Sequence, residues 1–257
     1  MFDANNALRL VAQQLELQNY RVACQIADQA ITQFRNNGYL LEVAGQAHYG
    51  LTDYSQAMAR FESAASLIPL ATNAKLRLAN CYLQTGHPVA ANAVANELAG
   101  KFFRKELSST LARSLVQCLC ELKKFDTAAK ICEQIFHSDF TNGHACYGVA
   151  WYRFLNGVNL CKSLSWLEQA VQLQPENARY RISLGYAYAN SFDIAAAIQT
   201  FNGFTPSLVR NIKCRWCLIQ MIEFLDLHDP HNLGVKPLLH ARLVAIEPTH
   251  KRPFSQE

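Results

Sequence analysis

The chain has 257 residues, of which half are apolar, and a formal net charge of +4. This length allows one large domain or two small ones, and the mild charge does not by itself indicate a nucleic-acid-binding protein. No apolar run approaches the roughly 18 residues that a membrane span needs, so membrane insertion is not expected.

The N-terminal residues and the cysteine pattern bear on whether the protein is secreted or cytoplasmic. Met1 to Asn6 lacks the basic start and apolar core of a secretory signal, so none is expected. Nine cysteines are scattered through helical segments without regular spacing, which does not favour a disulfide-stapled secreted fold. We therefore expect a cytoplasmic protein.

Residues 4–37 are expected to form a first pair of helices. Leu10 and Val11 lie in the first helix, and the second carries small residues at Ala23, Ala27 and Ala30. Asn36-Asn37-Gly38 then provides a turn or a left-handed helix end.

The stretch from Leu40 to Pro69 shows the pairing most clearly, with a turn near Leu51 to Asp53 and Pro69 expected to end the second helix. Gly45 and Ala57 are small enough to let the two helices approach closely, and Phe61 fills the space beside them. Residues at helical spacing mark both helices: Leu41, Ala44, Gly45 and His48, then Tyr54, Ala57, Phe61 and Ala64.

This register of small, aromatic and proline positions resembles the tetratricopeptide repeat, whose helix pair occupies 34 residues. Each such pair has too little interior to stand alone, and stacking several pairs buries a continuous core. The resemblance implies an α-helical solenoid, and the same frame can be followed along the rest of the chain.

Three further pairs are expected at residues 72–105, 109–142 and 141–177. The first turns at Thr85-Gly86-His87-Pro88, where Pro88 suits a helix start. About three extra residues at Arg104 to Ser108 interrupt the 34-residue spacing. In the last of the three, the turn from Leu155 to Asn159 is about three residues longer than the standard one.

The remaining chain gives one clear pair and one atypical pair. Residues 178–206 repeat the pattern and end at Gly203 and Pro206. From Leu208 to Asp226 we expect one longer apolar helix, followed by a last helix that reaches Pro248. This final unit, 207–248, is an atypical repeat or a cap, and residues 249–257 form a tail that is expected to be frayed.

The predicted fold is therefore all-α, a right-handed α-solenoid of about seven tetratricopeptide-like helix pairs. We expect a single domain over residues 1–248, with repeats at about 4–37, 38–71, 72–105, 109–142, 141–177, 178–206 and 207–248.

Chemistry-bearing motifs are few. Cys214 and Cys217 form a C-x-x-C pair, which allows a metal or redox site or two buried thiols. Its expected position inside an apolar helix favours buried thiols, because a redox pair usually begins at a helix N-terminus. The sequence lacks a G-x-S-x-G elbow, an H-E-x-x-H pair and a glycine-rich phosphate loop. We predict no catalytic residue, no cofactor and no metal.

The family resemblance implies protein recognition, because fold alone does not define function. The prediction is a non-enzymatic scaffold or adaptor that binds a partner protein or peptide segment in a concave groove. One alternative is a dedicated chaperone for a secreted or assembly-prone partner. The other is a small-ligand or metal-binding regulatory subunit.

In this repeat family, the first helix of each pair lines the concave surface. The corresponding positions of the 34-residue frame supply the predicted partner-binding residues: Arg9, Gln46, Tyr49, Asn73, Arg77, Asn80, Arg113, Gln117, Tyr152 and Arg179.

Basic side chains outnumber acidic ones in this set, which favours an acidic or amide-rich partner segment held by Arg77, Arg113 and Arg179. The alternative is that these arginines are solvated or pair with neighbouring carboxylates. Arg77 and Asn80 resemble part of the clamp with which chaperone-tail-binding members grip a C-terminal carboxylate. Glu42 and Gln46 stand where that clamp needs lysine and asparagine, which argues against a chaperone tail.

Overall fold

The structure is a computed structural model that describes residues 3–246. This part of the chain forms fifteen α-helices and one short 3-10 helix, and it contains no strand. The predicted all-α helical-repeat class is confirmed. The predicted tail, residues 249–257, and the end of the predicted last helix at Pro248 lie outside the described residues.

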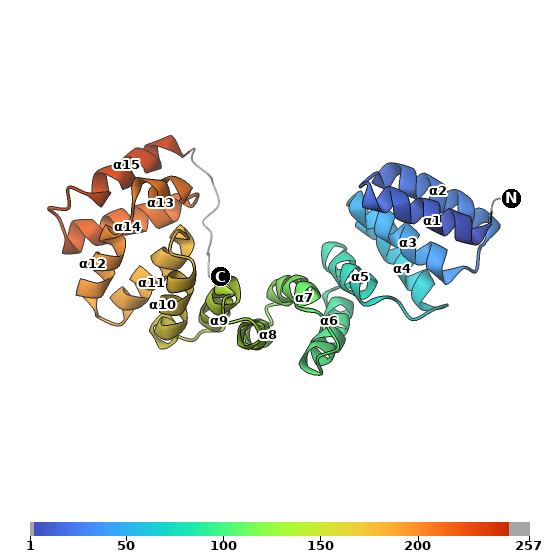
Figure 1. The fold of residues 1–257 in the computed structure, drawn as a ribbon, viewed down its shortest axis with the longest axis horizontal. Helices are drawn as coiled ribbons and strands as arrows, with labels where there is room; N and C mark the ends of the chain where they lie inside the picture. Colours follow the sequence, from blue (N-terminus) through green and yellow to red (C-terminus); the bar gives the residue numbers. More distant parts are fainter. Residues whose placement is uncertain (1–2, 247–257) are drawn as a thin grey trace. The chain divides into compact units, whose positions relative to one another are not determined.

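The chain divides into two compact units, Met1–Thr127 and Ala128–Glu257 (Figure 1). The division falls within the first turn of α8, which is described below with the second unit. The prediction of a single domain over residues 1–248, with its repeat boundaries, stays a prediction.

The first unit consists of consecutive helix pairs. Within it, α1 contacts α3, α3 contacts α5, and α5 contacts α7, so the first helices of the pairs form a row. The elements are α1 (Ala4–Glu16), α2 (Tyr20–Gln33), α3 (Gly38–Gly50), α4 (Tyr54–Ala65), α5 (Thr72–Gln84), α6 (Pro88–Phe103) and α7 (Ser109–Glu121).

The contact between α3 and α4 follows from residue size. A Cβ atom built on Gly45 would lie 2.7 Å from the Phe61 ring, which is fully buried. Ala57 is fully buried in the same cluster. Only a residue without a side chain therefore fits at position 45, as the sequence pattern predicted.

The turns inside the helix pairs share one backbone feature, a single residue with positive φ. Glycine occupies it at Gly86 and Gly157, where a left-handed conformation has no Cβ penalty. The other turns place residues with side chains there: Gln18, Thr52, Lys123 and Phe192.

One prediction at the helix ends of the first unit was right in one of its two alternatives, and another was wrong. At Asn36-Asn37-Gly38, where a turn or a left-handed helix end was expected, the chain turns at Arg35 and Asn36. Gly38 is the first residue of α3, and the Asn37 side chain accepts the N–H groups of Tyr39 and Leu40. Pro69 does not end α4, which stops at Ala65. Gly38 is small because Ile68 packs 2.9 Å from where its Cβ would be.

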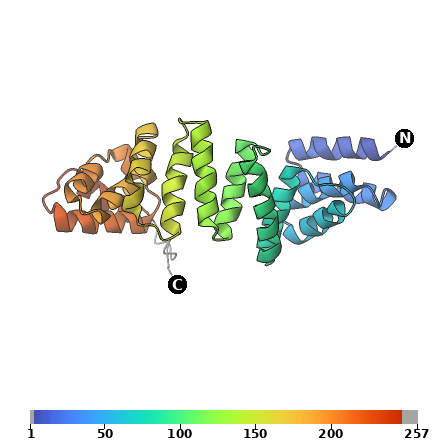
Figure 2. The same cartoon turned by 90° about the horizontal axis from the view of Figure 1, so that it is seen from below.

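The second unit is less regular. Its helices α8 and α9 stand side by side (Figure 2). An ion pair between Arg153 and Glu133, with an N–O distance of 3.1 Å, joins them. The elements are α8 (Phe125–Ser138), α9 (Gly143–Leu155), the 3-10 helix η1 (Leu160–Ser163), α10 (Leu164–Leu173), α11 (Ala178–Asn190), α12 (Ile194–Asn202), α13 (Pro206–Asn211), α14 (Arg215–His228) and α15 (Val235–Ala245).

The predicted long helix from Leu208 to Asp226 was wrong. The chain leaves α13 at Ile212, whose backbone is extended, and α14 starts only at Arg215. Ile212 is nevertheless buried, and its carbonyl oxygen accepts the Nε–H of Arg242 from α15 at 3.0 Å. A donor from a distant helix thus replaces the bond that helix continuation would have given.

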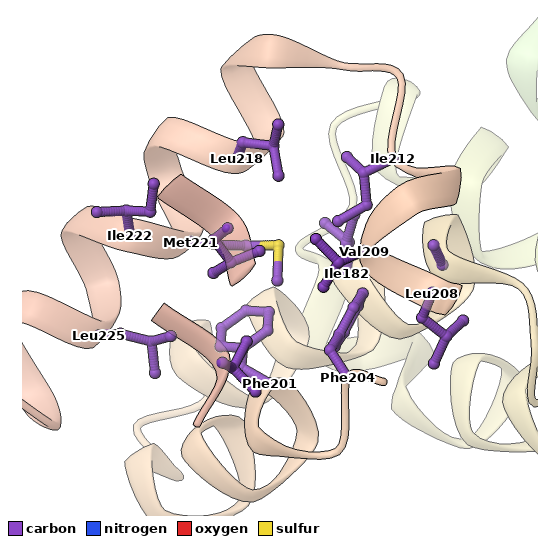
Figure 3. Packing of buried hydrophobic residues seen from close by; sticks show 13 residues of the cluster. Ile182, Phe201, Phe204, Leu208, Val209, Ile212, Leu218, Met221, Ile222 and Leu225 are labelled. Atoms are coloured by element: carbon purple, nitrogen blue, oxygen red, sulfur yellow. The ribbon is translucent and has the colours of Figure 1, made fainter. Parts of the chain in front are cut away.

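Apolar side chains from both sides of this break pack into one cluster. Ile212 and Leu218 both turn towards Met221, near the centre of the cluster (Figure 3). Leu218 and Met221 are fully buried. The break therefore costs little apolar burial, which is why an apolar pattern alone could not reveal it.

Candidate functional site

A hollow of about 260 Å³ lies within the first unit, between α5 and α7. One wall comes from α5, the facing wall from α7, and α3 contributes one tyrosine. Its lining residues are Tyr49, Asn73, Leu76, Arg77, Asn80, Leu83, Leu111, Ser114, Gln117, Cys118 and Glu121. The first helices of consecutive pairs therefore supply all of the lining.

Arg77 is the cation of this hollow. Its guanidinium lies over the Tyr49 ring, 5.5 Å from the centroid, and Nη1 donates to Gln46 Oε1 at 3.3 Å. Gln46 in turn donates to Glu42 Oε1 at 3.4 Å. These contacts fix the orientation of the planar Arg77 guanidinium group. The hydrogen bond to Gln46 uses one of the five N–H donors of that group. The remaining donors suit a carboxylate or a carbonyl group.

Asn80 stands one turn from Arg77 and provides an acceptor. Its Nδ2 donates to the Tyr49 hydroxyl at 3.0 Å, while its Oδ1 is buried and accepts no hydrogen bond. A buried, unmatched acceptor costs about 1–3 kcal/mol.

Tyr49 holds both groups in place as a neutral phenol. Burial, followed by the nearby Tyr54 and Cys81, raises its pKa. The Tyr49 and Tyr54 rings meet edge to face with centroids 5.7 Å apart. Burial also raises the pKa of the Cys118 thiol to about 11, helped by Glu121 and Cys120, so Cys118 is a neutral thiol at pH 7.

A second candidate surface in the other unit is built on Arg179. This exposed residue of α11 places its guanidinium 5.5 Å from the Tyr147 ring centroid and 5.2 Å from that of Trp151. Tyr147 also stacks on Tyr180 at 4.4 Å and hydrogen-bonds Ser183 at 3.1 Å. Arg179 is thus oriented by aromatic faces, without the amide partner that Arg77 has.

The cysteine pair lies in the second unit, at a position the sequence did not predict. Cys214 is the N-cap of α14, and its Sγ accepts the backbone N–H of Cys217 at 3.2 Å. The prediction that both cysteines lie inside one apolar helix was wrong, because the chain breaks at Ile212.

The predicted partner-binding residues fall into separate groups. Six of them come together around the hollow: Gln46, Tyr49, Asn73, Arg77, Asn80 and Gln117. Arg9 lies on α1 and donates to Asn6 Oδ1 at 3.1 Å. Arg113 is exposed on α7 and does not line the hollow. Tyr152 is half-buried on α9 and belongs, like Arg179, to the second unit.

Several lining residues were missed. Leu76, Leu83 and Ser114 occupy the fifth, twelfth and sixth places of the same 34-residue frame. A choice restricted to large polar residues left them out. Glu121 lies outside those places of the frame, so no signal in the frame indicated it.

Within residues 3–246, no group of three or more His, Cys, Asp or Glu side chains is arranged to hold a metal ion. The described helices also include none with the length and apolar character needed to cross a membrane.

Comparisons with known proteins identify the repeat and the fold. Residues 44–113 match the family model described as tetratricopeptide repeat. A search of curated proteins gives no significant match. The C-terminal part of a TPR repeat-containing protein from Cytophaga hutchinsonii is 15% identical, with a TM-score of 0.71, over 95% of this chain and 96% of that one.

Two further solved structures share the fold at lower similarity. PilW, described as a type IV pilus biogenesis factor, is 12% identical with a TM-score of 0.55, over 91% of this chain and 97% of that one. A structure of Naa15/Naa10 bound to HypK-THB is 13% identical with a TM-score of 0.55, over 93% of this chain and 39% of the matched one.

Proposed function

We propose that this chain, a tetratricopeptide-repeat protein by its fold and by residues 44–113, is a non-enzymatic scaffold or adaptor that binds a partner protein segment. Helical-repeat proteins use the extended surfaces of stacked helices for such binding. The observation that carries the proposal is the Arg77–Tyr49–Asn80 arrangement in the wall of the hollow. The fold is also found in the structure of Naa15/Naa10 bound to HypK-THB.

The chemistry of the hollow favours an extended segment with acidic or amide side chains. Arg77 offers charge-assisted donors to the carboxylate or amide oxygens of such a segment. A hydrogen bond to a charged group typically contributes about 1.5–3 kcal/mol. Leu76, Leu83 and Leu111 supply apolar contact beside these polar groups.

A chaperone C-terminal tail is a poor fit to this surface. Glu42 stands where the tail-binding clamp needs a cation, and its Oε2 accepts the backbone N–H of Ala71 at 3.2 Å. Its Oε1 accepts the amide of Gln46. Two carboxylates, that of Glu42 and that of a tail, would repel each other across Gln46.

We place the protein in a reducing cytoplasm. Five of the nine cysteines are buried as thiols, and burial raises the pKa of Cys81 to about 12 and of Cys146 to about 11. Such thiols serve as small apolar groups in the core. A reducing compartment keeps them in that form.

The experiment begins with affinity purification of the full chain from native lysate and identification of its partner by mass spectrometry. Binding of that partner is then measured for Arg77→Ala and for Arg113→Ala. We expect Arg77→Ala to weaken binding by at least about tenfold, since one charge-assisted bond is worth that much. Arg113→Ala is the matched control, because it removes an exposed arginine outside the hollow.

If wild type and Arg77→Ala bound the partner equally well and had the same melting temperature, the partner-binding site would lie outside this hollow. Stable co-purification with a single aggregation-prone partner would instead favour the dedicated chaperone. A retained small molecule or metal in the purified protein would favour the regulatory subunit.

A further inference from the structure

The two cysteines of the C-x-x-C pair are held in contact at the start of α14. Cys214 caps the helix, and its Sγ accepts the Cys217 N–H at 3.2 Å. The Cys214 side chain also lies close enough to the Cys217 thiol to add to burial in raising its pKa. Cys214 and Cys217 are both half-buried residues. The arrangement brings two thiols together at a helix N-terminus, where redox-active pairs are found.

The loop that carries Cys214 is fixed by two arginines that connect it to α15. Arg242 donates to the Ile212 carbonyl oxygen at 3.0 Å. Arg215, in the first turn of α14, donates to the carbonyl oxygens of Leu243 at 2.7 Å and Ile246 at 3.1 Å. Ile212 and Leu218 anchor the same segment in the apolar cluster (Figure 3). The two sulfurs are therefore placed by contacts on both sides and not by a flexible loop.

The surroundings distinguish the two thiols. Burial, followed by the Cys214 side chain, raises the pKa of Cys217 to about 12, so Cys217 rests as a neutral thiol. Tyr186 lies close enough to both sulfurs for their charges to add to burial in raising its pKa. Its hydroxyl is buried and forms no hydrogen bond. The pair thus shares its surroundings with a buried phenol that has no hydrogen-bond partner.

We propose that Cys214 and Cys217 form a thiol–disulfide exchange site whose substrate is a disulfide. Cys214 loses its proton and attacks one substrate sulfur, and the departing thiolate takes up a proton. Cys217 then attacks Cys214 Sγ in the mixed disulfide and gives its proton to the second departing thiolate. Two protein thiols are oxidised to one disulfide, and the substrate disulfide is reduced to two thiols. This activity is independent of the hollow in the first unit.

The test uses the full wild-type chain in buffers of fixed oxidised-to-reduced glutathione ratio. Free thiols are blocked by alkylation, and disulfides are mapped by peptide mass spectrometry. We expect a Cys214–Cys217 disulfide that dithiothreitol reverses. Cys118 and Cys120 are the internal control, because residues two apart on α7 point to different faces and cannot pair.

Two variants assign the roles. Cys217→Ser should accumulate glutathione on Cys214, because the resolving thiol is missing. Cys214→Ser should accumulate at least about tenfold less on Cys217, the more shielded thiol. Reduction of insulin by the reduced chain would identify protein disulfides as substrates, and reaction with oxidised glutathione alone would identify small disulfides.

Absence of the Cys214–Cys217 disulfide from the wild-type chain in predominantly oxidised glutathione would overturn the proposal. Mixed disulfides of Cys118 and Cys120 with glutathione, formed to the same extent as the Cys214–Cys217 disulfide, would overturn it too. They would indicate nonspecific oxidation. Both readouts use the wild-type chain and do not depend on whether a variant folds.

Discussion

The two units use one packing rule and build different surfaces on it. Gly45 in the first unit and Gly185 in the second each face the ring of a fully buried phenylalanine sixteen residues later, Phe61 and Phe201. A Cβ would lie 2.7 Å from the first ring and 2.4 Å from the second. One helix pair in each unit, α3–α4 and α11–α12, thus has the same glycine–phenylalanine contact in its interior.

The arginines on the two surfaces differ, because Arg77 is half-buried and Arg179 is exposed. Arg77 rests on one ring and binds Gln46 beside a lined hollow. Arg179 rests on Tyr147 and Trp151 in the second unit, which also carries the cysteine pair at the start of α14. The repeat therefore constrains the residues between its helices strongly and leaves the residues on its surface free to diverge.

The largest expected effect tests the shared interior. Gly185→Ala should destabilise the protein by roughly 1–3 kcal/mol, because the buried Phe201 ring cannot move aside, and Gly45→Ala should cost somewhat less. Chemical denaturation of each variant measures both.

Gly100→Ala is the control for those two substitutions. Gly100 lies inside α6, and the nearest atom to an added Cβ is the flexible end of Arg104 at 3.5 Å. There the substitution should stabilise by about 0.5–1 kcal/mol through helix propensity. If Gly45→Ala and Gly185→Ala behaved like Gly100→Ala, the packing rule would be wrong for both units.

A smaller effect tests the turns inside the pairs. Gly86 has φ of +80° with open space around it, whereas Phe192 has φ of 62° with a side chain that is 91% exposed. Gly86→Ala should cost about 1 kcal/mol, since a side chain in the left-handed region is strained. Phe192→Gly should gain up to about 1 kcal/mol, because it relieves that strain and loses almost no burial.

Thermal melts of the two turn variants check these opposite signs. A loss of stability in Phe192→Gly would show that the exposed ring makes a contact in solution. In that case the positive-φ residue would be stabilising through its side chain in the second unit but not in the first.

The smallest effect concerns an ion pair of the first unit. Glu97 lies 2.7 Å from Lys75 and 3.2 Å from Lys101, and the hydrogen bond from Lys75 is the main reason that its pKa is lowered. A lowered folded-state pKa means that the stabilisation is complete above the unfolded value and disappears as the pH falls through the folded one. Because the carboxylate is partly exposed, the contribution should stay below about 1 kcal/mol.

Unfolding free energies of wild type and Glu97→Gln between neutral and strongly acidic pH measure this contribution. The difference should be largest near neutrality and vanish in acid. A difference that stayed constant with pH would assign the effect to packing of the side chain and not to its charge.

Local patterns in the sequence were sufficient for the helix pairs and for part of the hollow. The Gly45 and Phe61 positions are sixteen residues apart, so their contact belongs to one helix pair and its spacing can be read directly. Arg77, Asn80 and Gln117 followed from places in the same frame. The frame also contained Leu76 and Leu83, which only a preference for polar residues excluded.

The helix break between α13 and α14 depends on contacts between residues far apart in the sequence, which no local pattern reveals. Apolar residues run through Ile212 whether or not the helix continues, and both outcomes bury them. The break is stabilised by Arg242, thirty residues further on, which binds the carbonyl oxygen that the helix would otherwise have paired. That distant bond, and not the apolar pattern, puts Cys214 at a helix N-terminus beside Cys217.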